Sequence, residues 1–97
     1  MNYFFHEAAR VEHLEHVAYY EDRQTGLGAH YLAAFDAAMV HVCEAPSRYR
    51  VEFPPSIRRF RVPGFPFNIL YRMVGAEIEV LVVAPHRRRP GYWLGRR

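Results

Sequence analysis

The sequence first limits the possibilities by what it lacks. It contains one cysteine, Cys43, and no lysine. A single cysteine excludes an internal disulfide framework and a thiolate zinc finger. The longest apolar run, 80–85, is far shorter than the roughly 20 residues of a membrane-spanning helix. No basic region precedes an apolar stretch at the N-terminus, so we predict no signal peptide, no membrane partner and a cytoplasmic protein.

Length and composition predict one domain. The chain has 97 residues, of which 51% are hydrophobic and 15% aromatic, and this is enough for one modest core. Seven prolines and six glycines are scattered along the chain, which excludes a fibrous or disordered polypeptide. We therefore expect residues 1–97 to form a single domain.

Charge is distributed unevenly. All 13 basic residues are arginine. Residues 48–97 contain eleven arginines and three acidic residues, whereas residues 1–47 contain two arginines and seven acidic residues. A basic half in a small domain is typical of proteins that bind a polyanion or an acidic protein. Arginine also favours planar, bidentate contacts with phosphate or carboxylate groups.

The first elements predicted are a strand and a helix. The aromatic run at 2–6 has no helical spacing and indicates a short strand. A helix follows from residue 6 or 7 to about residue 22, and Val11, Leu14 and Ala18 form its apolar stripe.

A second helix is predicted from about residue 27 to residue 44. The glycine-containing segment 24–28 separates it from the first helix, and Pro46 ends it. Its apolar stripe consists of Leu27, Tyr31, Phe35, Ala38 and Val42. The short break indicates that the two helices are antiparallel.

After Pro46 the hydrophobic period changes to two, which predicts strands at 57–62, 67–73 and 78–84. The last of these is apolar at nearly every position, so we expect it to be central and covered on both faces. The resulting order is β-α-α-β-β-β. It predicts an α+β domain in which a helical hairpin packs on one face of a small sheet.

The segment 86–93 contains the groups that a phosphate site needs. They are His86, Arg87, Arg88, Arg89, Tyr92 and Trp93. Arginine binds phosphate, histidine or tyrosine transfers protons, and aromatic rings stack on bases. We expect the three arginines to continue from the central strand as an extended row, because Pro90 restricts the backbone before it. Trp93 is expected to fold back as a hydrophobic anchor.

A second basic group lies on the predicted strands. It consists of Arg58, Arg59, Arg61 and Arg72. If the helices cover the opposite face, these arginines form an open basic surface. An ordinary solvated sheet face is the alternative.

Other motifs for chemistry are weak or missing. His13 and His16 are three residues apart on the first helix, a spacing at which two imidazoles can share a metal. A solvated helix face is the favoured interpretation, and we predict no metal site. The sequence contains no phosphate-binding P-loop, dinucleotide-binding loop, nucleophile elbow or HExxH, so we predict no cofactor.

Several short segments together resemble one protein family. They are Tyr19-Tyr20-Glu21, Gly26-Leu27-Gly28, Pro46-Ser47-Arg48-Tyr49, Ile57-Arg58-Arg59, the run 65–72 and the run 86–93. In order and spacing they are similar to the RelE/ParE superfamily of type II toxin–antitoxin toxins, and particularly to the ParE-like, plasmid stabilization branch. The resemblance implies a helical hairpin on a small, mainly antiparallel sheet. It also implies an acidic antitoxin as partner, in a hetero-oligomer.

The resemblance leaves the molecular target open. RelE-type members cleave mRNA on the ribosome without a metal, whereas ParE-type members inhibit DNA gyrase and are not enzymes. If the chain is RelE-like, Arg72, His86, Arg87 and Tyr92 match its catalytic positions, and Glu52, in an irregular loop, is the one carboxylate available as base. Pro90-Gly91 before the aromatic residues favours the ParE-like branch.

We therefore interpret the chain as a ParE-like toxin that inhibits DNA gyrase. The arginines expected to contact a polyanion or protein partner are Arg58, Arg59, Arg61, Arg87, Arg88 and Arg89. A ribosome-dependent mRNA interferase is the first alternative. A non-toxic basic module that docks on nucleic acid or the ribosome is the second.

Overall fold

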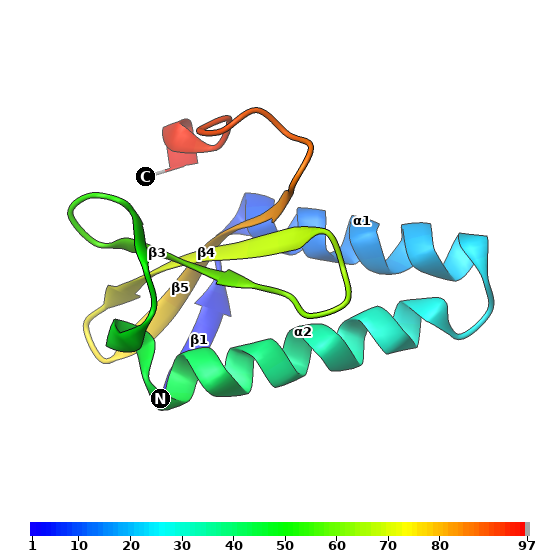
Figure 1. Ribbon diagram of the computed structural model, residues 1–97, viewed down its shortest axis with the longest axis horizontal. Helices are drawn as coiled ribbons and strands as arrows, with labels where there is room; N and C mark the ends of the chain where they lie inside the picture. Colours follow the sequence, from blue (N-terminus) through cyan, green and yellow to red (C-terminus); the bar gives the residue numbers. More distant parts are fainter. Residues whose placement is uncertain (97) are drawn as a thin grey trace.

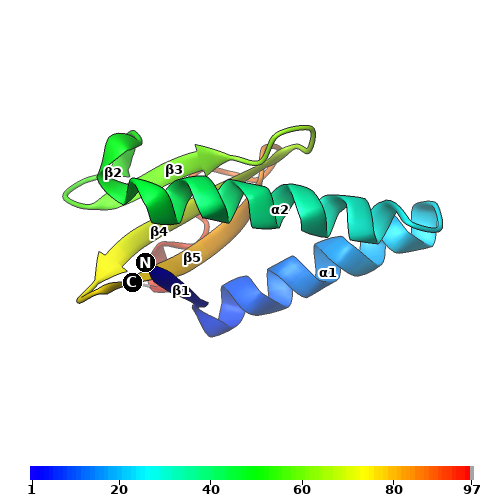
Figure 2. The same ribbon diagram turned by 90° about the horizontal axis from the view of Figure 1, so that it is seen from below.

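The computed structural model describes residues 1–96 and confirms the predicted α+β fold. The elements are β1 (Asn2–Phe5), α1 (Glu7–Arg23), α2 (Leu27–Glu44), the 3-10 turn η1 (Pro46–Arg48), β2 (Val51–Phe53), β3 (Ile57–Arg61), β4 (Phe67–Val74), β5 (Glu77–Pro85) and the 3-10 turn η2 (Leu94–Arg96). The helical hairpin lies on one side of the sheet and the C-terminal segment on the other (Figure 1 and Figure 2). Within residues 1–96, no helix is both long and apolar enough to cross a bilayer.

The sheet has the order β1-β5-β4-β3-β2. Strand β1 is parallel to β5, and the other pairs are antiparallel. Leu70 is opposite Val82 while Tyr71 is opposite Val80, so Leu81 is the extra residue of a β-bulge. The bulge places both Leu81 and Val82 in the hydrophobic cluster on the side away from the helices. Strand β5 is thus buried on both faces, as its apolar run predicts.

Strand β2 was not predicted from the sequence. Val51 pairs with Arg58 and Phe53 with Ile57, with a register irregularity between them. Three residues followed by two prolines are too short for a period of two to be recognised. Glu52 therefore lies on an edge strand, and its placement in an irregular loop was wrong.

The turn between the helices depends on close backbone approach. Gly26 has φ of +90°, in the left-handed region that favours glycine. The Glu21 carboxylate accepts hydrogen bonds from the backbone N–H groups of Gly26 and Gly28. A Cβ at Gly28 would lie 2.8 Å from the Val17 carbonyl oxygen, so only glycine lets the helices approach this closely.

The predicted inward face of α2 is confirmed, and that of α1 is wrong. Tyr31, Phe35, Ala38 and Val42 of α2 are all buried. On α1, Val11 and Leu14 are 46% and 53% exposed, whereas Ala9 and His13 are buried. The physical reason is that α1 packs along β5, where it turns polar side chains toward the strand's backbone.

The C-terminal segment covers the second face of the sheet. Trp93 is only 3% exposed and joins Ile57, Leu70, Leu81 and Val82 in a hydrophobic cluster. The expectation that Trp93 anchors the tail is therefore confirmed.

The expectation of an extended arginine row is wrong. The chain turns as soon as β5 ends, because the Arg88 N–H donates to the Pro85 carbonyl. Gly91, with φ of +80°, then permits a second reversal before η2. The three arginines therefore lie on a loop and not along a continuation of the strand (Figure 1).

Candidate functional site

Strand β5 has no neighbouring strand on one edge beyond the end of β1. There the backbone of His6 and side chains from α1 and the tail supply the hydrogen bonds that a neighbouring strand would make. The His6 N–H donates to the Val80 carbonyl, and Arg96 donates to the Leu81 carbonyl at 3.0 Å. Glu12 accepts from the Val83 N–H at 3.2 Å, and His16 Nε2 donates to the Val83 carbonyl at 3.1 Å. This strand edge would otherwise present unpaired polar groups in a largely buried place.

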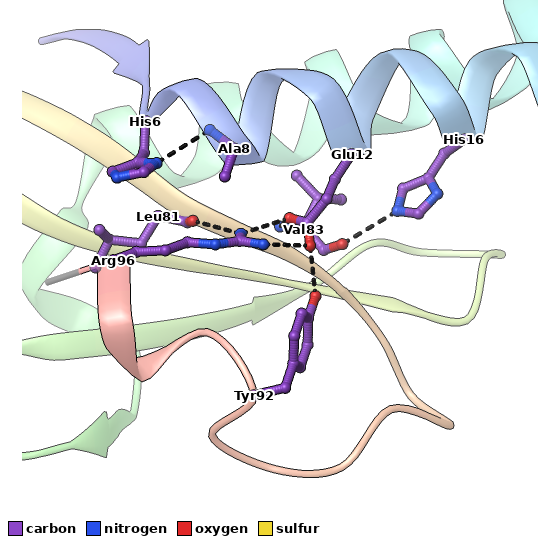
Figure 3. A network of polar contacts seen from close by, with 8 residues as sticks. All are labelled: His6, Ala8, Glu12, His16, Leu81, Val83, Tyr92 and Arg96. Carbon is purple, nitrogen blue, oxygen red and sulfur yellow. Dashed lines mark hydrogen bonds and ion pairs between the residues drawn. The ribbon is translucent and has the colours of Figure 1, made fainter.

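Glu12 is the centre of this arrangement. Its carboxylate accepts from the Tyr92 hydroxyl at 2.6 Å and from two Arg96 nitrogens at 2.8 and 2.9 Å (Figure 3). Burial raises the pKa of Glu12, but the hydrogen bonds from Arg96, Tyr92 and Val83 outweigh it and the net pKa is lowered. Glu12 therefore carries its charge and ties the tail to α1.

Tyr92 is committed to the same network. Burial, followed by its hydrogen bond to Glu12, raises the pKa of the Tyr92 hydroxyl. The Arg88 guanidinium lies over its ring, 4.0 Å from the centroid, an arrangement that favours attraction between cation and ring. The hydroxyl of Tyr92, a candidate catalytic residue if the protein is RelE-like, is thus committed as a hydrogen-bond donor to Glu12.

Arg72, the candidate phosphate ligand in the middle of the sheet, pairs across strands with Glu79. Its Nε lies 2.9 Å from the Glu79 carboxylate, and the two residues are register partners on β4 and β5. The Glu79 side chain is mostly buried, so its charge offsets that of Arg72 locally.

The arginines of β3 differ in what they contact. Arg58 donates to the Tyr49 carbonyl at 2.7 Å, and Arg59 lies 3.5 Å from the Glu52 carboxylate. Arg61 is exposed. Arg59 and Arg61, with Asn68 and His86, line a hollow of about 290 Å³.

His86 links this hollow to the tail. Its N–H donates to the Pro66 carbonyl at 2.9 Å, which fixes the backbone at the end of β5. Arg87, Arg88 and Arg89 follow directly and are all exposed. The structure thus brings His86 together with Arg59 and Arg61 and places the loop arginines next to it.

The four RelE-like candidates do not form one cluster. Arg72 lies opposite Glu79 of β5. Glu79 precedes His86 by seven residues, which is roughly 20 Å along an extended strand, so Arg72 and His86 lie far apart. Tyr92 faces Glu12 on the α1 side (Figure 3). Only His86 and Arg87 are neighbours.

Two residues of the polar network, Glu12 and Arg96, were not predicted from the sequence. They are 84 residues apart, and neither belongs to a recognisable motif. The apolar periodicity of α1 favoured the opposite face of the helix, so it gave no sign that Glu12 points inward.

Comparison with known families identifies the family of this chain. A family model described as "ParE toxin of type II toxin-antitoxin system, parDE" matches residues 3–90, which is nearly the whole chain. The chain belongs to the ParE toxin family. It is therefore a toxin component of a type II toxin–antitoxin system, and the family implies an antitoxin partner. No curated protein matches this sequence.

The matched range of this ParE-family toxin ends at Pro90. Tyr92, Trp93 and Arg96 lie beyond it. The hydrogen bonds that close the tail over Glu12 are thus made by residues outside the part that the family model describes.

The two histidines of α1 in this ParE-family toxin are packed in the interior, so the favoured interpretation as a solvated helix face was wrong. The His13 ring, 7% exposed, lies 4.2 Å from the Phe35 ring and 5.1 Å from the Phe5 ring, measured between centroids. His16 stacks on Phe67. Among residues 1–96, no group of three or more His, Cys, Asp or Glu side chains is placed to hold a metal.

We expect stability to decrease as the pH falls below about 6.5, the ordinary histidine pKa. Burial lowers the pKa of both His13 and His16 in the folded protein, so the unfolded chain binds protons that the folded chain does not. Each histidine then contributes a slope of at most about 1.4 kcal/mol per pH unit. Urea unfolding between pH 7.5 and 5.5 measures this slope.

His13→Phe, which keeps an aromatic ring among Phe5 and Phe35, should reduce the slope. The matched control is His30→Gln, at an exposed position of α2, which should leave the slope unchanged. A free energy of unfolding that is constant over this pH range contradicts the prediction.

Proposed function

We propose that this ParE-family toxin inhibits DNA gyrase and is neutralised by an acidic antitoxin. The family match over residues 3–90 is the observation that carries the proposal. The arrangement of the candidate residues agrees with it. Arg72 is paired with Glu79, Tyr92 donates to Glu12, and neither is free for phosphate chemistry in this conformation.

The exposed arginines are the proposed contact surface. Arg61 and the loop arginines Arg87, Arg88 and Arg89 are exposed, and none of the four takes part in an ion pair within residues 1–96. Unpaired guanidinium groups retain their capacity for bidentate contacts with carboxylates or phosphates. We propose that they contact an acidic surface of gyrase, and that an acidic segment of the antitoxin competes for part of the same region.

One observation favours an mRNA interferase as the second candidate. His86 shares a hollow with Arg59 and Arg61, and an imidazole beside two guanidinium groups is suited to protonating a leaving oxygen next to a bound phosphate. Arg59 is partly occupied by Glu52, so this site would rely mainly on Arg61.

Two assays on the purified protein distinguish the candidates. With DNA gyrase and supercoiled plasmid, we expect accumulation of gyrase-linked DNA breaks and loss of supercoiling activity. With translating ribosomes, we expect no codon-phased mRNA cleavage. Addition of a purified antitoxin, to be sought as the acidic product of a small open reading frame beside the toxin gene, should suppress the gyrase effect.

The opposite pattern selects the alternative. The interferase is established if the wild-type protein cuts mRNA on ribosomes and the rate of cutting falls about a hundredfold or more in His86→Ala. The melting temperature of the variant protein must be unchanged. Activity in neither assay, with growth unaffected by induction, contradicts both the gyrase and the interferase proposals and leaves the non-toxic docking module as the alternative to test.

A further inference from the structure

A pocket of about 390 Å³ lies between the second half of α1 and the ends of β4 and β5. It is separate from the hollow at Arg59 and Arg61, although His86 borders both. Its volume falls in the range of small-molecule sites. Neither the family match nor the proposed gyrase contact assigns a ligand to it.

The walls of the pocket are aromatic. Tyr19, Tyr20, His16 and Phe67 line it. The His16 and Phe67 rings are stacked with centroids 4.0 Å apart, and Tyr19 and Tyr20 meet edge to face at 5.4 Å. Aromatic walls favour a flat ring as ligand, because such a ring gains both stacking and edge contacts.

His16 also supplies a polar group with a defined orientation. Its Nε2 donates to the Val83 carbonyl, and burial lowers its pKa and keeps the ring neutral. The remaining nitrogen, Nδ1, therefore has a lone pair and acts as an acceptor. Glu15, which also lines the pocket, is a second acceptor. Heterocycles with ring or exocyclic N–H groups match such acceptors.

The mouth of the pocket carries a cation. Arg87 and His86 border it at the end of β5. Arg87 and Tyr20 line the same pocket, so the guanidinium borders the space enclosed by the aromatic side chains. Arg87 has no acidic partner among residues 1–96 and is suited to a phosphate.

We propose that this pocket binds a nucleotide, with the base between the aromatic walls and the phosphate at Arg87. A purely apolar ligand would leave the two acceptors and Arg87 unused, and a bare phosphate would leave the aromatic walls empty. A nucleotide uses all three features. The ligand is either a free mononucleotide or one unpaired nucleotide of a single strand, since both present the same base and phosphate.

Calorimetric titration of the purified toxin with AMP tests the proposal, and NMR shifts of the Tyr20, Phe67 and His86 amides locate the site. We expect saturable binding of AMP, and binding at least about tenfold weaker for adenosine, which lacks the phosphate, and for ribose 5-phosphate, which lacks the base. A five-nucleotide single-stranded oligoadenylate, titrated in parallel, distinguishes the two sources: it binds more tightly than AMP if the pocket serves a strand.

Two variants and a control complete the test. Tyr19→Ala, at an exposed position, and Arg87→Ala should each weaken AMP binding about tenfold or more. Leu14→Ala, exposed on α1 outside the pocket, should not change it. Failure to bind AMP and the oligonucleotide at millimolar concentration, or equal binding of AMP and ribose 5-phosphate, overturns the proposal. Because the assay uses no gyrase, its result is independent of the proposed function.

Discussion

Replacing Glu12 by alanine is expected to lower the free energy of unfolding by about 3 kcal/mol or more. The substitution leaves Arg96 largely buried without its carboxylate partner. It also leaves the Val83 N–H and the Tyr92 hydroxyl without their acceptor. A buried charge or donor that loses its partner costs far more than the pair contributes when it is intact. Urea unfolding followed by the fluorescence of Trp93, the one tryptophan, measures the loss.

Glu15→Ala is the matched control. It removes the same charge from the same helix, but Glu15 is exposed and has no ion pair within residues 1–96, so a change below about 0.5 kcal/mol is expected. Arg96→Ala should cost much less in the Glu12→Ala background than in the wild type, because the two residues act as a pair. Additive losses in this double-mutant cycle contradict the network.

Glu12 also explains why the sequence predicted one helix correctly and the other wrongly. Helix α2 packs its apolar stripe against other apolar side chains, so local periodicity identifies its inner face. Helix α1 instead faces a strand edge that has no neighbour after Phe5, and polar side chains satisfy that edge. Nothing local to α1 indicates an unpaired edge of a strand some 70 residues later in the sequence.

The strands and the tail also show that features local to one segment were predicted, whereas features that depend on backbone hydrogen bonds were not. The three longer strands were predicted because alternation and an apolar run are properties of a single segment. Burial of Trp93 was predicted because a large aromatic near a terminus is rarely left in water. The turn after Pro85 was not predicted, because a backbone hydrogen bond from Arg88 leaves no trace in side-chain pattern. The β-bulge at Leu81 was missed for a similar reason.

For the candidate site, the sequence indicated which residues are cationic, but not which of these side chains lack a hydrogen-bond or ion-pair partner within the protein. Arg58, Arg59 and Arg72 contact a carbonyl or a carboxylate in the structure. These partners, Tyr49, Glu52 and Glu79, are brought close by strand pairing and the preceding turn. Arg61 and the loop arginines lack such partners within residues 1–96. The tertiary structure therefore reduces the arginines available for binding a partner from the whole basic half of the sequence to those around the end of β5.

That surface is the basis of the prediction with the largest expected effect on activity. Arg87→Ala combined with Arg88→Ala should abolish growth arrest while the protein stays folded and retains much of its antitoxin affinity. Both side chains are exposed, and the Arg88 guanidinium lies over the Tyr92 ring. Loss of two charge-assisted contacts, each contributing about 1.5 to 3 kcal/mol, lowers affinity for the target by a factor of about 10² to 10⁴.

The measurement is growth after induction, with toxin levels matched by immunoblot and folding checked by thermal melting. Arg48→Ala combined with Arg50→Ala is the matched control, since it removes the same charge from exposed positions before β2 and should leave toxicity intact. Trp93→Ala should behave differently from both: truncating a buried aromatic costs about 3 to 5 kcal/mol, so stability and toxicity should be lost together. If the Arg87 and Arg88 double variant still arrests growth at equal expression, the loop at the end of β5 is not the surface that meets the target, and the remaining exposed arginine of the sheet, Arg61, becomes the residue to test.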